Sequence, residues 1–314
     1  MPDNHLTDNK FLVVIAGPTA SGKTRLAADV AGKYNAEVFS ADSRQIYREM
    51  NIGTARPSMD EMAGIPHHFI GEASIFDSWS TGRYIQNLSE RLSDYFTSHE
   101  VAVLSGGTGL YIKALLEGLD NFPAISESTK TLVREKFAGS GISYLKEELL
   151  IRDPVYYEMA DTDNPRRLIR ALEVCLEAGV PYSSFFGTAT KSRPLFTPVM
   201  ILLEWPREEL YCRINERVDR MMAQGLLEEA SDLLPYRGFP ALDTVGYREL
   251  FDYLEGKTNF NTAVSLIRQN TRRYAKRQMT WFRKYGDWTV FHPEAKEDIF
   301  RHIEEKFENI ANRT

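Results

Sequence analysis

The chain has 314 residues, of which 43% are hydrophobic and 26% are charged, as is usual for globular proteins, and this length predicts a core domain with an added part. Because the first ten residues are polar, we expect no signal peptide. Because no apolar run approaches ~20 residues, we also expect no membrane span. The net charge of −6 by itself argues against a nucleic-acid partner.

The first predicted element is a buried strand, the apolar run at residues 11–16, and a predicted helix follows at residues 25–31. Between them, Gly17-Pro18-Thr19-Ala20-Ser21-Gly22-Lys23-Thr24 fits G-x-x-x-x-G-K-[ST] at every fixed position. In such a loop the backbone N–H groups and the helix N-terminus cradle phosphates, Lys23 reaches the outer phosphates, and the Thr24 hydroxyl holds Mg²⁺. The loop predicts a polyphosphate ligand without specifying ATP; the alternative is a chance glycine-rich turn.

Alternating strands and helices continue along the first part of the chain. We predict strands at residues 37–41 and 101–104, and helices at 81–98 and 111–117. This alternation predicts the α/β class, a doubly wound parallel sheet of the P-loop type.

Polar residues follow two of these strands at the edge where such sheets bind ligands. Asp42 comes directly after the strand at 37–41 and is placed to act as a general base; alternatively, it caps the element that follows. The strand at 101–104 leads into Ser105-Gly106-Gly107-Thr108-Gly109 and not into the Walker-B aspartate of hydrolytic P-loop enzymes. This indicates transfer from a small phosphorylated donor, although a plain strand-to-helix turn remains an alternative for the glycines.

The pattern changes after residue 121. Helices are predicted at 129–137, 144–150 and 165–178, a strand returns at 199–203, and the chain from Glu208 onward is expected to be helical. We therefore predict a helical insertion at residues 122–195, within an α/β core formed by residues 1–121 and 196–314 with C-terminal helices. The two isolated cysteines, Cys175 and Cys212, are expected to be packing residues in a reducing, cytoplasmic protein.

One segment is strongly basic although the chain is acidic. Residues 264–286 carry seven basic and no acidic side chains, so the rest of the chain has a net charge of −13. Helical spacing places Arg273 and Arg277 among these charges on one broad face. Such a face indicates a polyanion site, and the alternative is a solvated surface.

Eight short segments together resemble the tRNA dimethylallyltransferase (tRNA isopentenyltransferase) family. They are Gly17–Thr24, Ala41-Asp42-Ser43-Arg44-Gln45-Ile46-Tyr47, Asn51-Ile52-Gly53-Thr54-Ala55-Arg56-Pro57, Ile65-Pro66-His67-His68, Gly106-Gly107-Thr108-Gly109-Leu110-Tyr111, Asn164-Pro165-Arg166-Arg167-Leu168-Ile169-Arg170, Val245-Gly246-Tyr247-Arg248 and Thr271-Arg272-Arg273-Tyr274-Ala275-Lys276-Arg277-Gln278. The segments occur in order over roughly residues 11–285, and the ordered set is specific although the phosphate loop alone is not.

The resemblance implies transfer of a dimethylallyl group from dimethylallyl diphosphate to N6 of adenosine 37 in the anticodon stem-loop of tRNA, with release of diphosphate. It implies Mg²⁺ as cofactor, a monomer, and catalytic roles for Lys23, Asp42 and Arg217, the last near the diphosphate. A surface salt bridge is the alternative for Arg217. The adjacent His67 and His68 are expected to serve a structural turn, because their side chains diverge. The tRNA contacts implied are Asp42, Ser43, Arg44, Gln45, Thr108, Lys130, Arg166, Arg167, Leu168, Ile169, Arg170, Gly246, Tyr247, Arg248, Arg273 and Arg277.

Three other functions remain open at this point. A small-molecule kinase uses the same loop, an isopentenyltransferase can act on free adenine nucleotides, and a non-catalytic RNA-binding protein can keep a vestigial loop. The basic segment and the insertion favour a macromolecular acceptor, and intact Lys23, Thr24 and Asp42 argue against a vestigial site.

Overall fold

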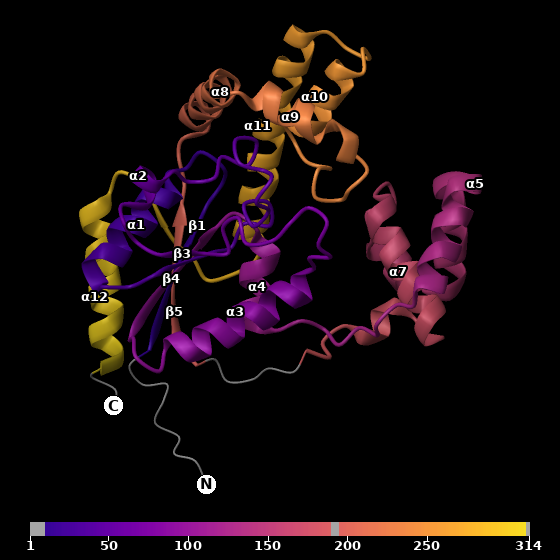
Figure 1. The fold of residues 1–314 in the computed structure, drawn as a ribbon. Coiled ribbons are helices and arrows are strands. Elements are labelled where there is room, and N and C mark those ends of the chain that lie inside the picture. The colour runs from indigo at the N-terminus through magenta and orange to yellow at the C-terminus, as the bar shows by residue number, and fades with distance from the viewer. Residues whose placement is uncertain (1–9, 190–194, 312–314) are drawn as a thin grey trace. The chain divides into compact units, whose positions relative to one another are not determined.

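The computed structural model describes residues 10–189 and 195–311 (Figure 1). Its strands are β1 Phe11–Ala16, β2 Val38–Ser40, β3 His67–His68, β4 Val101–Gly106, β5 Thr197–Leu203 and β6 Thr289–Phe291. Its α-helices are α1 Lys23–Tyr34, α2 Met59–Met62, α3 Thr81–Tyr95, α4 Gly109–Glu117, α5 Glu127–Arg152, α6 Pro154–Met159, α7 Pro165–Ala178, α8 Arg207–Ala223, α9 Leu226–Leu233, α10 Tyr247–Leu254, α11 Phe260–Lys284 and α12 Lys296–Ala311. No helix in these described stretches is long and apolar enough to cross a membrane.

The strands form one parallel sheet in the order β3-β2-β4-β1-β5-β6. In this sheet Ala16 at the end of β1 lies opposite Gly106 of β4, and Ser40 at the end of β2 lies opposite Ser105. The glycine-rich loop, Asp42 and Thr108 therefore emerge at the same edge of the sheet. The predicted α/β parallel-sheet class is confirmed.

Side chains of β1 alternate between two hydrophobic layers, as the period of a strand requires. Val13 and Ile15 pack with Leu26 of α1 and Ile299 of α12, whereas the even-numbered residues face the layer that includes α3 and α4. Helices thus cover both faces of the sheet (Figure 1). The uninterrupted apolar run of β1 follows from this double burial.

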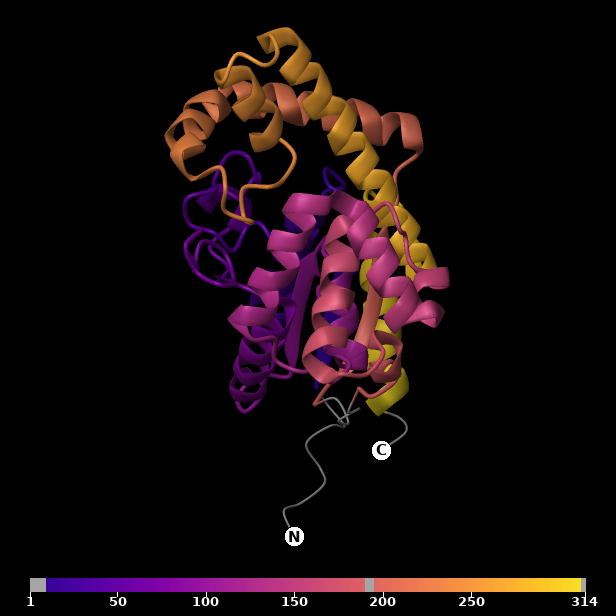
Figure 2. The same cartoon turned by 90° about the vertical axis from the view of Figure 1, so that its right-hand side faces the viewer.

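The C-terminal helices extend this core beyond the carboxyl ends of the strands. Figure 2 shows α8, α9 and α10 above that edge, with α11 running from this helical group down beside the sheet. Leu226, Leu250, Ile267 and Phe282 join these helices to the layer over α3 and α4. A polyphosphate bound at the edge would therefore lie beneath residues from the C-terminal third of the chain.

Two compact units are present, one formed by Met1–Leu116 with Arg193–Thr314 and the other by Glu117–Ser192. The second unit has its own core, which includes Val133 of α5 and Leu172 of α7. The buried Asp153 carboxylate links two segments of this unit, because it accepts hydrogen bonds from the Tyr156 N–H and from the Ser183 N–H and hydroxyl.

Several expected elements differ in detail. The two helices expected at 129–137 and 144–150 form the single span α5, broken where Gly141 adopts a φ of 66°. The expectation of helix alone after Glu208 is wrong at β6, and β3 and α6 were not expected. Cys175 is buried as expected, but Cys212 is exposed, so a packing role for Cys212 is wrong.

Candidate active site

The glycine-rich loop joins β1 to α1 in a strained conformation. Gly22 has a φ of 90°, which glycine adopts freely, but Ala20 has a φ of 64°, which costs on the order of 1 kcal/mol for a residue with a Cβ. Such strain persists only where surrounding contacts hold the backbone. The Trp205 indole N–H donates to the Ser21 carbonyl (3.2 Å), and Arg213 Nε donates to the Ala20 carbonyl (3.2 Å).

Lys23, the first residue of α1, lies partly buried against this loop. Its Nζ donates to the Pro18 carbonyl at 2.6 Å. Burial and the nearby Arg217 guanidinium lower the pKa of Lys23 to about 7, against the opposing effect of the Asp42 carboxylate. An ammonium held at such a low pKa is stabilised by any anion that enters the loop.

Asp42 lies two residues beyond the end of β2, and its two carboxylate oxygens differ. Oδ1 accepts the backbone N–H groups of Arg44 (2.8 Å) and Gln45 (3.3 Å), which fixes the side chain in a turn. Within the part of the chain that the structure describes, Oδ2 accepts no hydrogen bond. The capping alternative thus accounts for one oxygen only, and the other is available to accept a proton.

Thr108 fastens the ends of β2 and β4 together. Its N–H donates to the Ala41 carbonyl at 3.0 Å, and its Oγ1 accepts the Ser43 N–H at 3.0 Å. A Cβ on Gly106 would lie 2.2 Å from the Ala41 carbonyl oxygen, so this approach requires glycine. Thr108 and the segment beginning at Asp42 therefore form one rigid wall of the site.

Arg217 of α8 is partly buried, and its charge interacts with the Asp42 carboxylate of this wall. Burial lowers the pKa of Arg217, whereas the Asp42 carboxylate raises it. Among the described residues Arg217 forms no ion pair within 4.0 Å, which argues against a plain surface salt bridge. The structure thus brings Lys23, Asp42 and Arg217 into one electrostatic cluster beside the loop.

The segment at residues 51–57 holds Gln45 in place. The Gln45 amide donates to the carbonyls of Thr54 and Ala55. At the start of the segment, the Glu229 carboxylate accepts the three consecutive N–H groups of residues 51–53. Tyr247 is fully buried and donates its hydroxyl hydrogen to the same carboxylate at 2.7 Å. This burial contradicts the predicted contact between the Tyr247 side chain and RNA, so its role is to support the wall.

The neighbours of Tyr247 and Gln45 in the predicted tRNA set differ in accessibility: Gly246 is buried, Arg44 is half-buried and Arg248 is exposed. Gly246 has a φ of 100° and donates its N–H to Glu249, and exposed Arg248 pairs with Asp243 at 3.4 Å. The Arg44 guanidinium donates hydrogen bonds through Nη1 to the carbonyls of Pro240 and Ala241.

The basic face of α11, defined as Arg272, Arg273, Lys276 and Arg277, forms no ion pair with an acid in the described residues. Arg268 and Arg283 on the same helix are instead paired, with Asp219 and Glu204. Arg273 and Arg277 are exposed. Four uncompensated cations on an acidic protein favour an external anion over solvation alone.

A second basic site begins α7 in the other unit. Arg166, Arg167 and Arg170 are exposed there, and the first two lie in the first turn of the helix, where the dipole disfavours cations. Leu168 is fully buried, so its side chain packs in the core and cannot reach RNA. Ile169 is half-buried against the same core, and only part of its side chain is open to a ligand. Lys130 pairs with Glu127 at 2.6 Å.

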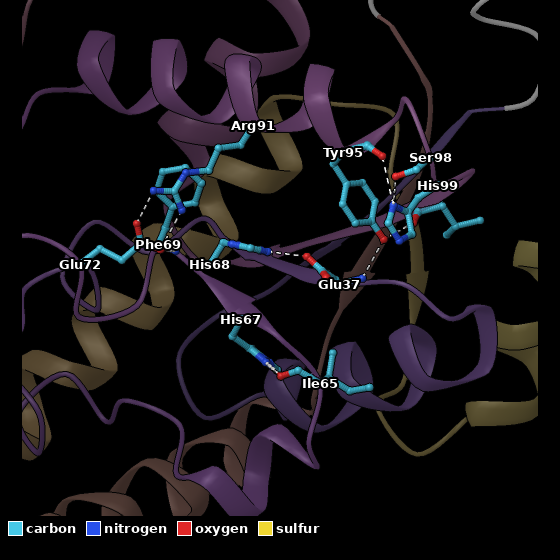
Figure 3. Close-up of polar contacts among 11 residues, drawn as sticks. Glu37, Ile65, His67, His68, Phe69, Glu72, Arg91, Tyr95, Ser98 and His99 are labelled. Atoms are coloured by element: carbon cyan, nitrogen blue, oxygen red, sulfur yellow. Dashed lines mark hydrogen bonds and ion pairs between the residues drawn. The ribbon is translucent and has the colours of Figure 1, made fainter.

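His67 and His68 diverge from β3, as expected for a structural pair (Figure 3). His68 Nε2 lies 2.6 Å from Glu37 Oε2, and His67 Nδ1 lies 2.8 Å from the Ile65 carbonyl. The described residues contain no cluster of three or more His, Cys, Asp or Glu side chains that could hold a metal ion.

Comparisons with known proteins agree on one family. The family model for IPP transferase matches residues 45–285. A tRNA dimethylallyltransferase of Christiangramia forsetii is 47% identical over 95% of this chain and 99% of its own, and one of Cytophaga hutchinsonii is 42% identical over 96% and 98%. The crystal structure of a Bacillus halodurans tRNA isopentenylpyrophosphate transferase is similar with a TM-score of 0.71 and 33% identity, covering 97% of this chain and 98% of that one.

Proposed function

The chain belongs to the IPP transferase family, and from this premise we propose that it transfers a dimethylallyl group from dimethylallyl diphosphate to N6 of adenosine 37 in tRNA, releasing diphosphate. The observation that carries the proposal is the cluster of Lys23, Asp42 and Arg217 at the phosphate loop. It places two cations for a leaving diphosphate beside one carboxylate for a proton.

The loop and its cations serve the leaving group. An aryl amine is a weak nucleophile, so ionisation of the allylic C–O bond leads, and negative charge grows on the diphosphate. Loop N–H groups, Lys23 and Arg217 then stabilise this charge, which is the main catalytic contribution. Because Lys23 has a pKa near 7 in the free protein, the bound diphosphate holds it in the charged form.

Mg²⁺ fits the residues at the start of α1. The Thr24 hydroxyl forms no hydrogen bond in the described parts of the chain, and a hydroxyl together with phosphate oxygens is a usual Mg²⁺ environment. When bound, the ion would supply further neutralisation of the diphosphate charge. Thr24 is the residue that would hold it.

Asp42 takes the proton that N6 loses as the new C–N bond forms. Oδ1 is fixed by the N–H groups of Arg44 and Gln45, so Oδ2 presents its lone pairs in a set direction. A positioned carboxylate of this kind is a competent general base. The target base lies in a tRNA loop and must leave its stack to reach this carboxylate.

RNA binding is assigned to the basic face of α11 and to Arg166, Arg167 and Arg170 of the other unit. The first has no acidic partner among the described residues, and the second presents three exposed arginines near the start of α7. A cytoplasmic monomer is the proposed setting, since this substrate is a cytoplasmic RNA.

The direct test supplies the protein with Mg²⁺, unmodified tRNA and labelled dimethylallyl diphosphate, followed by nuclease digestion. Label in N6-prenylated adenosine supports the proposal. In parallel reactions without tRNA, label on added AMP would identify a nucleotide isopentenyltransferase, and phosphate transfer from added ATP to a small molecule would identify a kinase. No transfer to any of these acceptors would contradict an enzymatic role.

Replacing Arg273 and Arg277 with alanine should make RNA binding less salt-dependent. Each neutralised phosphate contributes about 0.7–0.9 to the slope of log affinity against log salt, so the double variant should lose about 1.4–1.8 units of slope. Binding of dimethylallyl diphosphate should not change. Arg301→Ala, which removes one charge from α12 that pairs with Asp298, is the control for net charge. An unaltered slope in the double variant would make this face a solvated surface and leave the RNA to the arginines of α7.

A further inference from the structure

Gln278 is a polar residue on the buried face of α11. The neighbours that share this face at helical spacing are Ala275, Met279 and Phe282, and Gln278 itself is only 7% exposed. An amide buried without partners costs about 1–3 kcal/mol. Its place on an apolar stripe therefore requires specific hydrogen bonds.

Both ends of this amide are used. Oε1 accepts the Thr19 N–H at 3.0 Å, and Nε2 donates to the Gly107 carbonyl at 2.9 Å. Because a backbone N–H only donates and a carbonyl only accepts, these partners fix the orientation of the amide. One side chain of α11 thus ties the phosphate loop after β1 to the glycine segment after β4.

The glycine segment is shaped to admit α11. A Cβ on Gly107 would lie 2.2 Å from Gln278 Nε2, and a Cβ on Gly109 would lie 2.1 Å from Trp281 Cδ1. A larger residue at either position would force the Gln278 or Trp281 side chain of α11 out of its present place. Two of the glycines around Thr108 therefore serve the docking of α11, and the docked helix delivers Gln278 to Thr19.

Thr19 adjoins the strained residue of the loop. Ala20 holds a left-handed φ of 64°, and its carbonyl is already bonded to Arg213. The bond from the Thr19 N–H to Gln278 fixes the Pro18–Thr19 peptide, which lies one residue before this strained position. Without it, the loop can relax toward a conformation in which its N–H groups no longer converge on one anion.

We propose that Gln278 is a positioning residue for the diphosphate loop, acting through the Thr19 N–H and the Gly107 carbonyl without touching substrate. The inference rests on the proposed function for its kinetic consequences. The effect of Gln278 on anion binding can be measured with pyrophosphate alone, without prenyl transfer. The same helix presents Arg273 and Arg277 to solvent, so RNA binding is expected to be unaffected by a change at Gln278.

The first test is Gln278→Met, which keeps the length of the side chain and removes both hydrogen bonds. Calorimetry should show inorganic pyrophosphate binding about tenfold more weakly, because two hydrogen bonds of ordinary strength support the loop. In the transfer assay, kcat should fall by about tenfold to a hundredfold while KM for tRNA stays unchanged. Gln269→Met, at an exposed position of the same helix, is the matched control and should resemble the wild type.

The second test is Gln278→Glu, whose protonated form alone reproduces the native pattern of one acceptor and one donor. The ionised form would face the Gly107 carbonyl with an oxygen. Relative to wild type at the same pH, pyrophosphate affinity of this variant should therefore rise as the pH is lowered from about 8 to about 6. The ratio to wild type removes the contribution of Lys23, which titrates in both proteins.

The outcomes separate this inference from the proposed function. Equal pyrophosphate affinity in wild type and Gln278→Met, or a ratio for Gln278→Glu that is flat with pH, would overturn the role of Gln278. A wild type that binds pyrophosphate but transfers no prenyl group would overturn the function and leave the role of Gln278 in the loop intact. A wild type that binds no pyrophosphate would overturn both. Should Gln278→Met fail to fold, the pH series of Gln278→Glu decides alone.

Discussion

Asp42→Asn should lower the turnover of prenyl transfer by about 10²–10⁴, the usual contribution of a positioned general base. The amide oxygen of asparagine can still accept the N–H groups of Arg44 and Gln45, so the turn after β2 should survive. Thermal unfolding should therefore be nearly unchanged. Single-turnover measurement with saturating tRNA and dimethylallyl diphosphate isolates the chemical step.

Asp77→Asn is the matched control for this substitution. Asp77 is also a loop carboxylate that accepts a backbone N–H, from Ser74 at 2.7 Å, and it has no place in the proposed chemistry. Its replacement should leave turnover within about twofold of wild type, as for most surface changes. If Asp42→Asn retained full turnover while folding normally, another group would have to take the N6 proton.

The parts of the site that are contiguous in sequence could be predicted. The phosphate loop occupies eight successive residues between an apolar run and a helix, so its local pattern suffices. The meeting of Thr108 with the residues on either side of Asp42 also follows from sequence, because the carboxyl ends of parallel strands share one edge. The exposure of Arg273 and Arg277 follows from helical periodicity.

Other features depend on tertiary docking that no local pattern encodes. Gln278 reaches Gly107 across 171 positions of sequence, and its only local signal is a polar residue on the apolar stripe of α11. Tyr247 and Leu168 lie in segments that resemble binding motifs, yet their burial assigns them to packing. The strands β3 and β6 have two and three residues, too few for an alternating pattern to be read.

Lys23→Ala should reduce transfer by about 10²–10³, the usual loss when one preorganised charge stabiliser is removed. RNA affinity in a filter-binding assay should stay nearly the same, because the RNA surfaces are formed by other side chains. The control is Lys33→Ala at the opposite end of α1, where the ammonium pairs with Glu304 on the surface and contributes little. Equal losses of RNA affinity and activity in Lys23→Ala would contradict a diphosphate role.

The depressed pKa of Lys23 gives this residue a second, activity-independent signature. At about pH 8, above its pKa of about 7, Lys23 is mostly neutral in the free protein, whereas a bound diphosphate favours the ammonium form. Binding of pyrophosphate should therefore take up a proton, and affinity should fall as the pH rises through this range. Calorimetry in buffers of different ionisation enthalpy measures the uptake, which should disappear in Lys23→Ala and persist in Lys33→Ala. Proton uptake that survived in Lys23→Ala would mean that another group titrates on binding, and the assignment of Lys23 to the diphosphate would then rest on the loss of turnover alone.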